Sequence, residues 1–430
     1  MKLVFICSSL EPGRDGVGDY TRRLAAEFVR QGHRVRILAL NDKRDQATTD
    51  NGQQGQWSVV SGQQPAPTSA LQPPTSDDIS DFSISYFLCV QESDGTKVEC
   101  LRLPSALSWD IRVKLARQWV EAFNPDWVSL QFVPFSFHPK GLCFGLGKKL
   151  TAINSKAPWH IMFHELWLGL GEKSSIKHRL LGRLQRSIFR DIFHRLRPRI
   201  VHTHAEAYQT ALRRENMDAA ILPLFSNIPL ATGDAWADLI APKLALQGSV
   251  NTGRSQFYLA GVFGAVHPQW NVALAVNTVL PMVQRFQKRL VLVFFGKSNL
   301  NPEMFSQLRA ENHNRAEVII AGERPTDEIS KIMQVLDLGL ATSPRQLIPK
   351  SGSVAAMLEH GLPVLVIRDD WQLRGNHAQP ESKVLGLFSP EDFTRLEILP
   401  TKAAQPLASG LERIASRMLL AMELASSKKR

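Results

Sequence analysis

The stretch Ile348-Pro-Lys-Ser-Gly-Ser-Val-Ala-Ala-Met-Leu-Glu-His-Gly-Leu-Pro363, which runs directly into the apolar segment Val364-Leu-Val-Ile367, decides the fold. It predicts a polar loop, a short helix, a glycine stop and a buried strand. Ser351 and Ser353 are favourable residues for a helix start, and Gly361 stands where a helix ends in the left-handed region. Free N–H groups at a helix start beside a lysine form a ready anion site. In a parallel α/β sheet this loop lies at the carboxyl end of a strand, where ligands bind. The alternative is an ordinary loop whose serines only cap a helix.

Size and composition indicate a globular chain. With 430 residues, 44% of them hydrophobic and 21% charged, the sequence predicts two or three domains with substantial cores. The four cysteines (Cys7, Cys89, Cys100, Cys143) are scattered without metal-site spacing, which favours reduced thiols in a cytoplasmic protein. The N-terminal apolar run is too short for a signal peptide, and no stretch is long enough to cross a bilayer.

Strand and helix patterns alternate along the chain, which predicts an α/β fold. The predicted strands are 3–7, 35–40, 83–90, 126–132, 160–163, 200–203, 256–263, 290–295, 318–321, 338–341 and 364–367. The predicted helices are 20–31, 111–123, the basic segment 173–199, 272–286, 328–336, the helix after Ser353, and 410–426. This β-α-β order is typical of doubly wound parallel sheets.

The pattern weakens once in the middle of the chain, which sets the domain boundaries. We expect two Rossmann-like domains that face a central cleft, at residues 1–228 and 256–408, joined by a linker at 229–255. Residues 43–80, rich in Gln, Ser, Thr and Pro, predict a flexible insertion in the first domain. Residues 409–430 predict a closing helix with a basic tail.

The first loop of the chain is rich in glycine. Gly16-Val17-Gly18-Asp19 precedes the first predicted helix; the glycines permit close approach of a ligand, and Asp19 is a candidate helix cap. A dinucleotide-binding fingerprint needs a tighter G-x-G-x-x-G turn, so an NAD(P) enzyme, with Asp42 as its ribose-binding acid, remains only an alternative. A plain glycine-rich turn without a ligand is the other.

Two further strand ends of the first domain carry polar side chains. Gln131 opens an aromatic-rich stretch, 131–141, that suits stacking on a sugar or ordinary half-buried packing. His164 and Glu165 follow the next strand and offer a hydrogen-bond donor beside an acid. His202 and His204 resemble a metal pair only superficially, so no metal site is predicted.

In the second half, Lys297 follows a strand within Phe295-Gly296-Lys297-Ser298. Together with Lys350 it is a candidate to flank a diphosphate; the alternative is an exposed, solvated lysine.

Positive charge is concentrated in one segment. The net charge is +11, and residues 173–199 hold nine Lys and Arg against one acid, Asp191. Leucines, isoleucines and a phenylalanine fall between these charges at nearly helical spacing. Such a helix suits anionic lipid headgroups. The alternatives are a surface helix whose apolar stripe faces its own domain and, with no binding motif to support it, a nucleic-acid face.

Taken together, these loops resemble the GT-B glycosyltransferases, in particular the family-4-like group that uses nucleotide-sugar donors. The resemblance covers most of the chain outside 43–80. It is carried by Gly16-Val17-Gly18-Asp19-Tyr20, His164, Leu222–Pro229, Phe263-Gly264, Phe295-Gly296-Lys297, Ala356-Met357 and Gly361–Val364. It implies retention of anomeric configuration, no metal, and no cofactor apart from the nucleotide-sugar co-substrate.

The chain also departs from this group. Two donor-binding glutamates that the group carries ahead of its Ala-Met pair correspond here to Leu347 and Ala355. An Arg and a Lys that hold the diphosphate correspond to Ala265 and Trp270. We therefore expect Lys350, Ser351, Ser353 and Lys297 to take over diphosphate binding; the alternative is that the chain has lost ordinary donor chemistry.

The resemblance thus implies a glycosyltransferase acting on a hydroxyl acceptor, glycan or lipid-linked. The cysteines predict a cytoplasmic protein, and the basic segment 173–199 predicts contact with the inner face of a membrane. His164 and Glu165 are the candidate catalytic residues. The candidate donor-binding residues are Lys297, Lys350, Ser351, Gly352, Ser353 and Gly264. Gly16, Val17, Gly18, Asp19 and Gln131 are expected to line the acceptor side of the cleft. The alternatives are a non-catalytic GT-B-like binding subunit and another GT-B enzyme such as an epimerase or phosphorylase.

Overall fold

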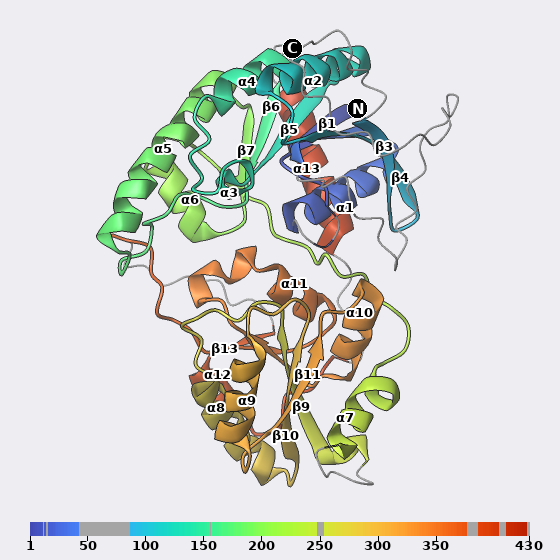
Figure 1. Cartoon of the computed structure of the whole chain (residues 1–430), viewed down its shortest axis with the longest axis vertical. Coiled ribbons are helices and arrows are strands. Elements are labelled where there is room, and N and C mark those ends of the chain that lie inside the picture. Colours follow the sequence, from blue (N-terminus) through green and yellow to red (C-terminus); the bar gives the residue numbers. More distant parts are fainter. Residues whose placement is uncertain are drawn as a thin grey trace.

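The computed structural model describes residues 1–11, 13, 16–42, 87–154, 156–246, 253–375, 386–403 and 410–427. The predicted insertion at 43–80 and the basic end of the predicted tail lie outside the described residues. The described chain forms two lobes, one above the other (Figure 1).

The upper lobe is built on one sheet with the strand order β3-β4-β2-β1-β5-β6-β7-β8. Its strands are β1 (Lys2–Cys7), β2 (Arg34–Asp42), β3 (Leu88–Ser93), β4 (Thr96–Pro104), β5 (Trp127–Phe132), β6 (Trp159–Phe163), β7 (Ile200–Thr203) and β8 (Ala220–Ile221). Its helices are α1 (Gly16–Arg30), α2 (Trp109–Phe123), α3 (Pro134–Phe137), α4 (Leu146–Ile153), α5 (Ile176–Leu196) and α6 (Glu206–Arg213). Apart from the β3–β4 pair, every pairing in this sheet is parallel.

The lower lobe is built on a second, parallel sheet with the order β11-β10-β9-β12-β13-β14. Its strands are β9 (Phe257–Phe263), β10 (Arg289–Phe295), β11 (Glu317–Gly322), β12 (Leu338–Ala341), β13 (Val364–Val366) and β14 (Leu387–Phe388). Its helices are α7 (Ala241–Ala245), α8 (Val272–Arg285), α9 (Pro302–Asn312), α10 (Thr326–Val335), the 3₁₀ turn η5 (Arg345–Lys350), α11 (Gly352–Glu359) and α12 (Pro390–Thr394). The last helix, α13 (Gly410–Ser427), returns to the upper lobe.

Both sheets are covered on both faces, as the strand sequences require. In β1, Val4 and Ile6 enter the core on one face while Leu3 and Phe5 enter the core on the other. The second of these cores also contains the apolar face of α13, from Leu411 to Met422. The second sheet likewise separates two cores. The predicted fold class, two doubly wound Rossmann-like domains, is confirmed.

The edge of the first sheet differs from the prediction. Strand-like sequence was expected at 83–90; the described chain instead forms the antiparallel hairpin β3–β4. Asp94 and Gly95 form its turn with φ of 50° and 75°. An Asp-Gly pair at positive φ is the turn that joins two twisted strands most easily, and the sequence analysis passed over it. It also missed α4, α6 and α9.

Within the stretch predicted as linker, part of the chain belongs to the second core. A π-helical turn at Trp236–Ile240 leads into α7, and Ala235, Ile240 and Leu244 are buried with the strands of the second sheet.

Helix α5 lies tightly against the chain that precedes it, which yields a first test. A Cβ added at Gly182 would lie 1.9 Å from the carbonyl oxygen of Leu168. We expect Gly182→Ala to destabilise the protein by about 1–3 kcal/mol, because overpacking displaces backbone that cannot yield easily. Urea unfolding measures this change. Gly253→Ala is the control, since its Cβ would meet only Ser255 Oγ at 3.8 Å; equal effects of the two substitutions would contradict the packing argument.

Candidate functional site

The loop that opened the sequence analysis has the predicted structure. Strand β12 leads through η5 into α11, and β13 follows. Ser351 is the N-cap of α11 and accepts a hydrogen bond from Val354 N at 3.4 Å. Gly361 has φ of 79° at the end of the helix. Ser351 Oγ also lies 3.1 Å from Ser353 Oγ, and Gly352 is exposed.

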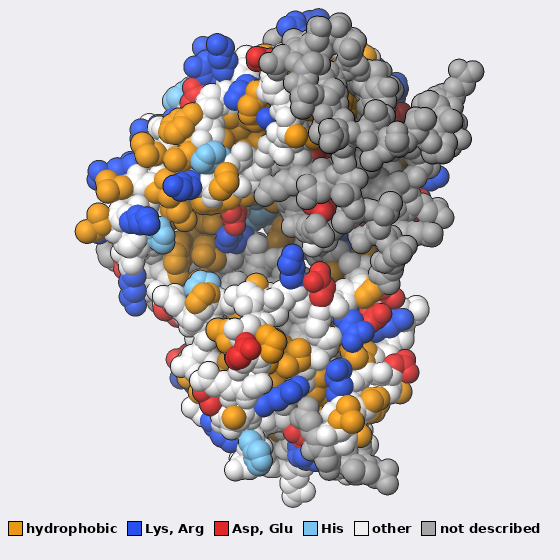
Figure 2. All heavy atoms as spheres, viewed as in Figure 1, with side chains coloured by type: hydrophobic (Ala, Val, Ile, Leu, Met, Phe, Trp, Pro, Cys, Tyr) orange, Lys and Arg blue, Asp and Glu red, His pale blue; other side chains and the backbone are white. Residues whose placement is uncertain are grey.

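Lys350 reaches from this loop to the other domain. Its Nζ lies 3.3 Å from Glu165 Oε1 and 5.5 Å from the ring centroid of Tyr208. Burial by itself lowers the pKa of Lys350, but Tyr208 and Glu165 outweigh it and raise the pKa to about 12. The side chain is therefore a permanent cation between the two domains. Figure 2 shows the surface hollowed between the lobes.

His164 lies at the end of β6 and is 6% exposed. Its Nε2 is 2.9 Å from Gln131 Oε1, and its Nδ1 is 3.0 Å from Nε2 of His204. His204 Nδ1 donates to Leu222 O at 2.9 Å. Tyr20 packs edge-on against both histidine rings. Both ring nitrogens of His164 thus have protein partners.

A second pair of histidines continues this buried chain. His160 Nε2 lies 2.9 Å from His202 Nδ1, and His160 Nδ1 lies 2.7 Å from Ser129 Oγ. Ser129 in turn contacts the amide of Gln131 at 2.7 Å. His202 and His204 thus have different partners: His202 contacts His160, whereas His204 contacts His164 and Leu222. Among the described residues, no group of three or more His, Cys, Asp or Glu is arranged to hold a metal ion.

The directions of the hydrogen bonds decide whether these four histidine rings carry a charge. The carbonyl of Leu222 can only accept, so Nδ1 of His204 carries a proton. If Oε1 of Gln131 faces His164, one of the rings His164 and His204 must carry an extra proton. With the amide of Gln131 turned the other way, every donor meets an acceptor and all four rings are neutral. Burial favours this neutral arrangement: it lowers the pKa of His202 and of His204 to about 4, and lowers the pKa of His160 and of His164 well below the usual value.

The glycine-rich loop of the first domain differs from the prediction. Helix α1 begins at Gly16, so Gly16, Val17, Gly18 and Asp19 form its first turn rather than a loop. A Cβ at Gly18 would lie 2.6 Å from the carbonyl oxygen of Ser9, so this glycine permits close helix–strand packing. Asp19 accepts a hydrogen bond from Gly13 N at 3.2 Å and pairs with Arg22, and burial raises its pKa.

The remaining donor-side candidates lie at neighbouring strand ends. Gly264 follows β9 and Gly296 follows β10, with φ of 84° and 80°. Lys297, next along the chain, is exposed. No hydrogen bond or ion pair joins Lys297 to Lys350 in the described part of the chain.

Sequence reasoning missed Arg368 at the end of β13. Its guanidinium, 5% exposed, donates to both oxygens of Asp370 at 2.8 Å, to Thr342 O at 3.2 Å and to Gln269 Oε1 at 2.9 Å. It thereby joins the loops that follow β9, β12 and β13. The Arg-Asp-Asp run directly after an apolar strand was the available signal. Tyr208, which sits on α6, gave no signal at all.

One carboxylate oxygen of Glu359 binds both segments in which the chain passes from one domain to the other. Oε1 accepts hydrogen bonds from Ser226 N at 2.9 Å and from Gly410 N at 3.1 Å. Ser226 lies where the chain leaves the first domain, and Gly410 lies where it returns. Burial raises the pKa of this carboxyl although both amides lower it.

A third link between the domains is a strap at 371–375, after β13. Glu172 N donates to Gln372 O, and Arg374 N donates to Leu170 O, both at 2.9 Å. Leu373 is 1% exposed and belongs to the core of the first domain.

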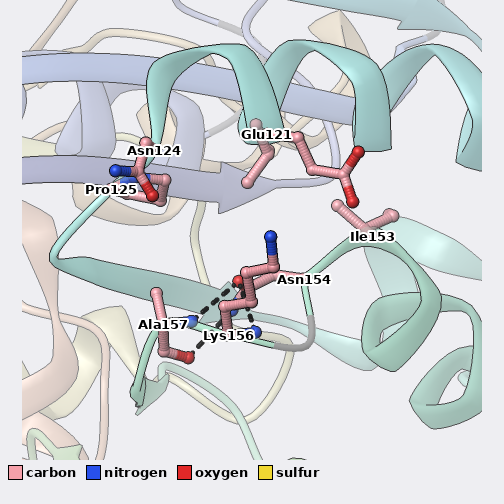
Figure 3. A pocket seen from close by; sticks show the side chains of 8 residues that line it. Glu121, Asn124, Pro125, Ile153, Asn154, Lys156 and Ala157 are labelled. Carbon is pink, nitrogen blue, oxygen red and sulfur yellow. Dashed lines mark hydrogen bonds between the residues drawn. The ribbon is translucent and has the colours of Figure 1, made fainter.

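A small pocket elsewhere in the first domain does not belong to this site. It is lined by Val120, Glu121, Asn124, Pro125, Ile153, Asn154, Lys156 and Ala157 (Figure 3). Asn124 and Pro125 precede β5, and Ala157 precedes β6, so the pocket lies at the amino edge of the sheet. The candidate site lies at the carboxyl edge.

Comparisons with known proteins concern the fold. No protein-family model and no curated protein sequence matches the chain. It is similar to sucrose-phosphate synthase from Thermosynechococcus elongatus (TM-score 0.48, 13% identity, 99% of this chain and 91% of that one covered). It is also similar to HepE from Anabaena in complex with UDP-glucose (TM-score 0.48, 15% identity, 100% and 99% covered). A third similar structure is WaaG, a glycosyltransferase involved in lipopolysaccharide biosynthesis (TM-score 0.44, 13% identity, 99% and 93% covered). The fold itself consists of two parallel-sheet domains and a final helix, α13, that packs on the first.

The buried histidines make stability depend on pH. The pKa values of these histidines are lower in the folded chain than in the unfolded chain. Below about pH 6.5 the unfolded chain therefore binds protons that the folded chain does not bind. We expect stability to be complete above pH 6.5 and to fall between pH 6.5 and pH 5 by up to about 1.4 kcal/mol per pH unit for each histidine. Urea midpoints across this range measure the slope. His160→Gln/His202→Gln should flatten it, whereas the exposed His313→Gln should not; a flat wild-type profile would contradict the neutral chain.

The strap gives a further test. We expect Leu373→Asp to release residues 371–375 from the first domain, because the core has no partner for a carboxylate at this position. Amide exchange at Glu172 and Arg374 should then become at least about tenfold faster. Hydrogen exchange with mass spectrometry measures this, with the exposed Asp369→Asn as control. Unchanged protection at both amides would show that Leu373 does not hold the strap.

Proposed function

We propose that this protein is a glycosyltransferase that moves a sugar from a nucleotide-diphosphate donor to a hydroxyl acceptor. One observation carries the proposal. Lys350 and the start of α11, at the carboxyl edge of one sheet, lie directly opposite Glu165 and His164, at the carboxyl edge of the other, with 3.3 Å between Lys350 Nζ and Glu165 Oε1. Ligands of α/β proteins bind at such edges. The UDP-glucose in the HepE complex is consistent with a uridine diphosphate sugar as the first donor to test.

The donor diphosphate is assigned to the second domain. Its oxygens would meet the ammonium of Lys350, the backbone amides of Gly352 and Ser353, and the exposed Lys297. Gly264, with φ of 84° and no atom within 4 Å of an added Cβ, leaves room beside them. When the donor binds, its phosphate oxygens replace Glu165 as the partner of Lys350. This exchange frees the carboxylate at the moment the donor is in place.

The acceptor side is assigned to the first domain. Glu165, with 41% of its side chain exposed, is the group that meets the acceptor hydroxyl and orients it. His164 would reach the transferring sugar only by giving up one of its two protein partners, Gln131 and His204. Gln131 fixes the ring of His164, and Gly16–Asp19 places the start of α1 beside this edge. Closure of the two domains would exclude water from the reaction.

The stereochemistry and the metal requirement come from the resemblance to the family-4-like enzymes. It implies retention of configuration without a metal ion. The charge that develops on the departing diphosphate then falls to Lys350 and the helix-start amides, and each such donor is worth roughly 3 kcal/mol of barrier.

The location is also part of the proposal. We place the enzyme in the cytoplasm because its four cysteines remain thiols, two of them buried. None of the described helices is both long and apolar enough to span a bilayer.

Replacement of Lys350 tests the site. We expect Lys350→Ala to lower kcat by roughly 100- to 1,000-fold, because one preorganised cation is lost from the leaving group. Turnover of a nucleotide-sugar, followed by release of the nucleoside diphosphate, measures this. Lys288→Ala, at the amino edge of β10, is the matched control and should leave turnover unchanged. Near-normal turnover of Lys350→Ala would refute the assignment of Lys350.

A non-catalytic GT-B-like subunit is the second candidate, and one observation favours it. At the positions of the two expected glutamates stand Leu347, half-buried against the core of the first domain, and Ala355. Calorimetry and a thermal-shift screen with uridine, guanosine and adenosine diphosphates and their sugar conjugates distinguish the two. Binding of one donor supports the transferase, and binding of none supports the subunit.

A further inference from the structure

The outer face of helix α5 carries an aliphatic stripe that the fold leaves uncovered. Ile176, Leu180 and Leu184 are 68%, 55% and 51% exposed. Residues four apart stack on one side of a helix, so these three form a continuous line along its first half. Large exposed aliphatic side chains in such a line, unlike single ones scattered over a surface, mark a contact surface.

This stripe is separate from the face that anchors α5. Gly182 packs against Leu168, and Gln185 binds Leu168 N at 2.7 Å and Lys140 O at 2.8 Å. Further along, Ile188, Ile192 and Leu196 enter the core of the first domain. The stripe predicted from the sequence thus divides, since its second half packs inward while its first half faces solvent.

Cations flank the exposed half. Lys173, Lys177, Arg179 and Arg183 are exposed, and none forms an ion pair in the part of the chain that the structure describes. At about 100° per residue, Lys177 lies on one side of the stripe while Arg179 and Arg183 lie on the other. The second half differs, because its arginines have acidic partners.

Those partners are Glu215 for Arg186 and Arg190, and Asp191 for Arg195. Positive charge on α5 is therefore neutralised where the helix packs on its domain and left unneutralised where the aliphatic stripe is exposed. Figure 2 shows hydrophobic and basic side chains gathered on the flank of the upper lobe where Figure 1 places α5.

We propose that residues 173–184, the end of the preceding loop and the first half of α5, dock on an anionic lipid bilayer. Aliphatic side chains at the centre and cations on both sides match the interface of such a bilayer, where acyl chains lie beneath anionic headgroups. A nucleic acid would engage the cations but offers nothing to the aliphatic stripe. Only the loop 166–175 separates this face from Glu165, so docking holds the candidate site next to the membrane surface. Docking thereby favours an acceptor that is carried by a lipid. This preference for the acceptor rests on the proposed function; the docking itself does not.

Co-sedimentation of the full chain with vesicles tests the docking without any activity assay. We expect binding to phosphatidylcholine vesicles that contain phosphatidylglycerol, weak binding to pure phosphatidylcholine, and a sharp loss of binding as salt rises. Lys177→Ala/Arg179→Ala/Arg183→Ala should weaken the partition coefficient by roughly 100-fold, at about tenfold or less per cation. Ile176→Ser/Leu180→Ser/Leu184→Ser should weaken it by at least about tenfold.

The matched controls remove the same number of groups elsewhere. Leu246→Ser/Leu420→Ser/Leu424→Ser removes aliphatic side chains that are 87%, 55% and 56% exposed, and Lys114→Ala/Lys243→Ala/Lys288→Ala removes three charges. Both should bind like the wild type. Equal binding to neutral and anionic vesicles would overturn the proposal. So would wild-type binding by the α5 serine variant, since attachment by charge alone would then suit a nucleic acid as well as a lipid.

Discussion

A single cation that spans two domains is the interaction on which the candidate site depends. The ammonium of Lys350 belongs to the second domain, yet its nearest acid, Glu165, belongs to the first. Neither sheet alone forms the site, because each contributes one half of it at its carboxyl edge. A phosphate and a carboxylate compete for the same ammonium, so binding of a donor and contact between the domains are coupled by elementary electrostatics.

The other links between the domains hold this pair at contact distance. Glu359 binds both crossings of the chain through one oxygen, and Leu373 anchors the strap in the core of the first domain. Lys350, Glu359 and Leu373, which make these three links, all belong to the segment between β12 and the residues after β13. That segment also contains the helix start at α11. The candidate donor-side loop therefore lies in the same segment as these contacts between the domains.

Behind the acceptor side, the buried histidines supply rigidity rather than proton transfer. Low pKa values keep the four rings neutral, and hydrogen bonds occupy both ring nitrogens of His160, His164 and His204. Glu165, half-buried and next to His164 in the chain, is the group that we propose to meet the acceptor. The division suits a site in which one residue holds geometry and the next meets the substrate.

The sequence by itself determined the two parallel-sheet domains, the helix and strand after Ser351, and the polar residues at the strand ends. These follow from local causes: apolar periodicity, capping side chains and glycine at positive φ. It also determined the basic amphipathic character of α5. Only the tertiary structure decided that Lys350 meets Glu165 and Tyr208, that His164 is sealed by Gln131 and His204, and that half of the stripe on α5 stays uncovered. Such pairings join residues distant in the chain, and their energies depend on burial and orientation, which no local pattern encodes.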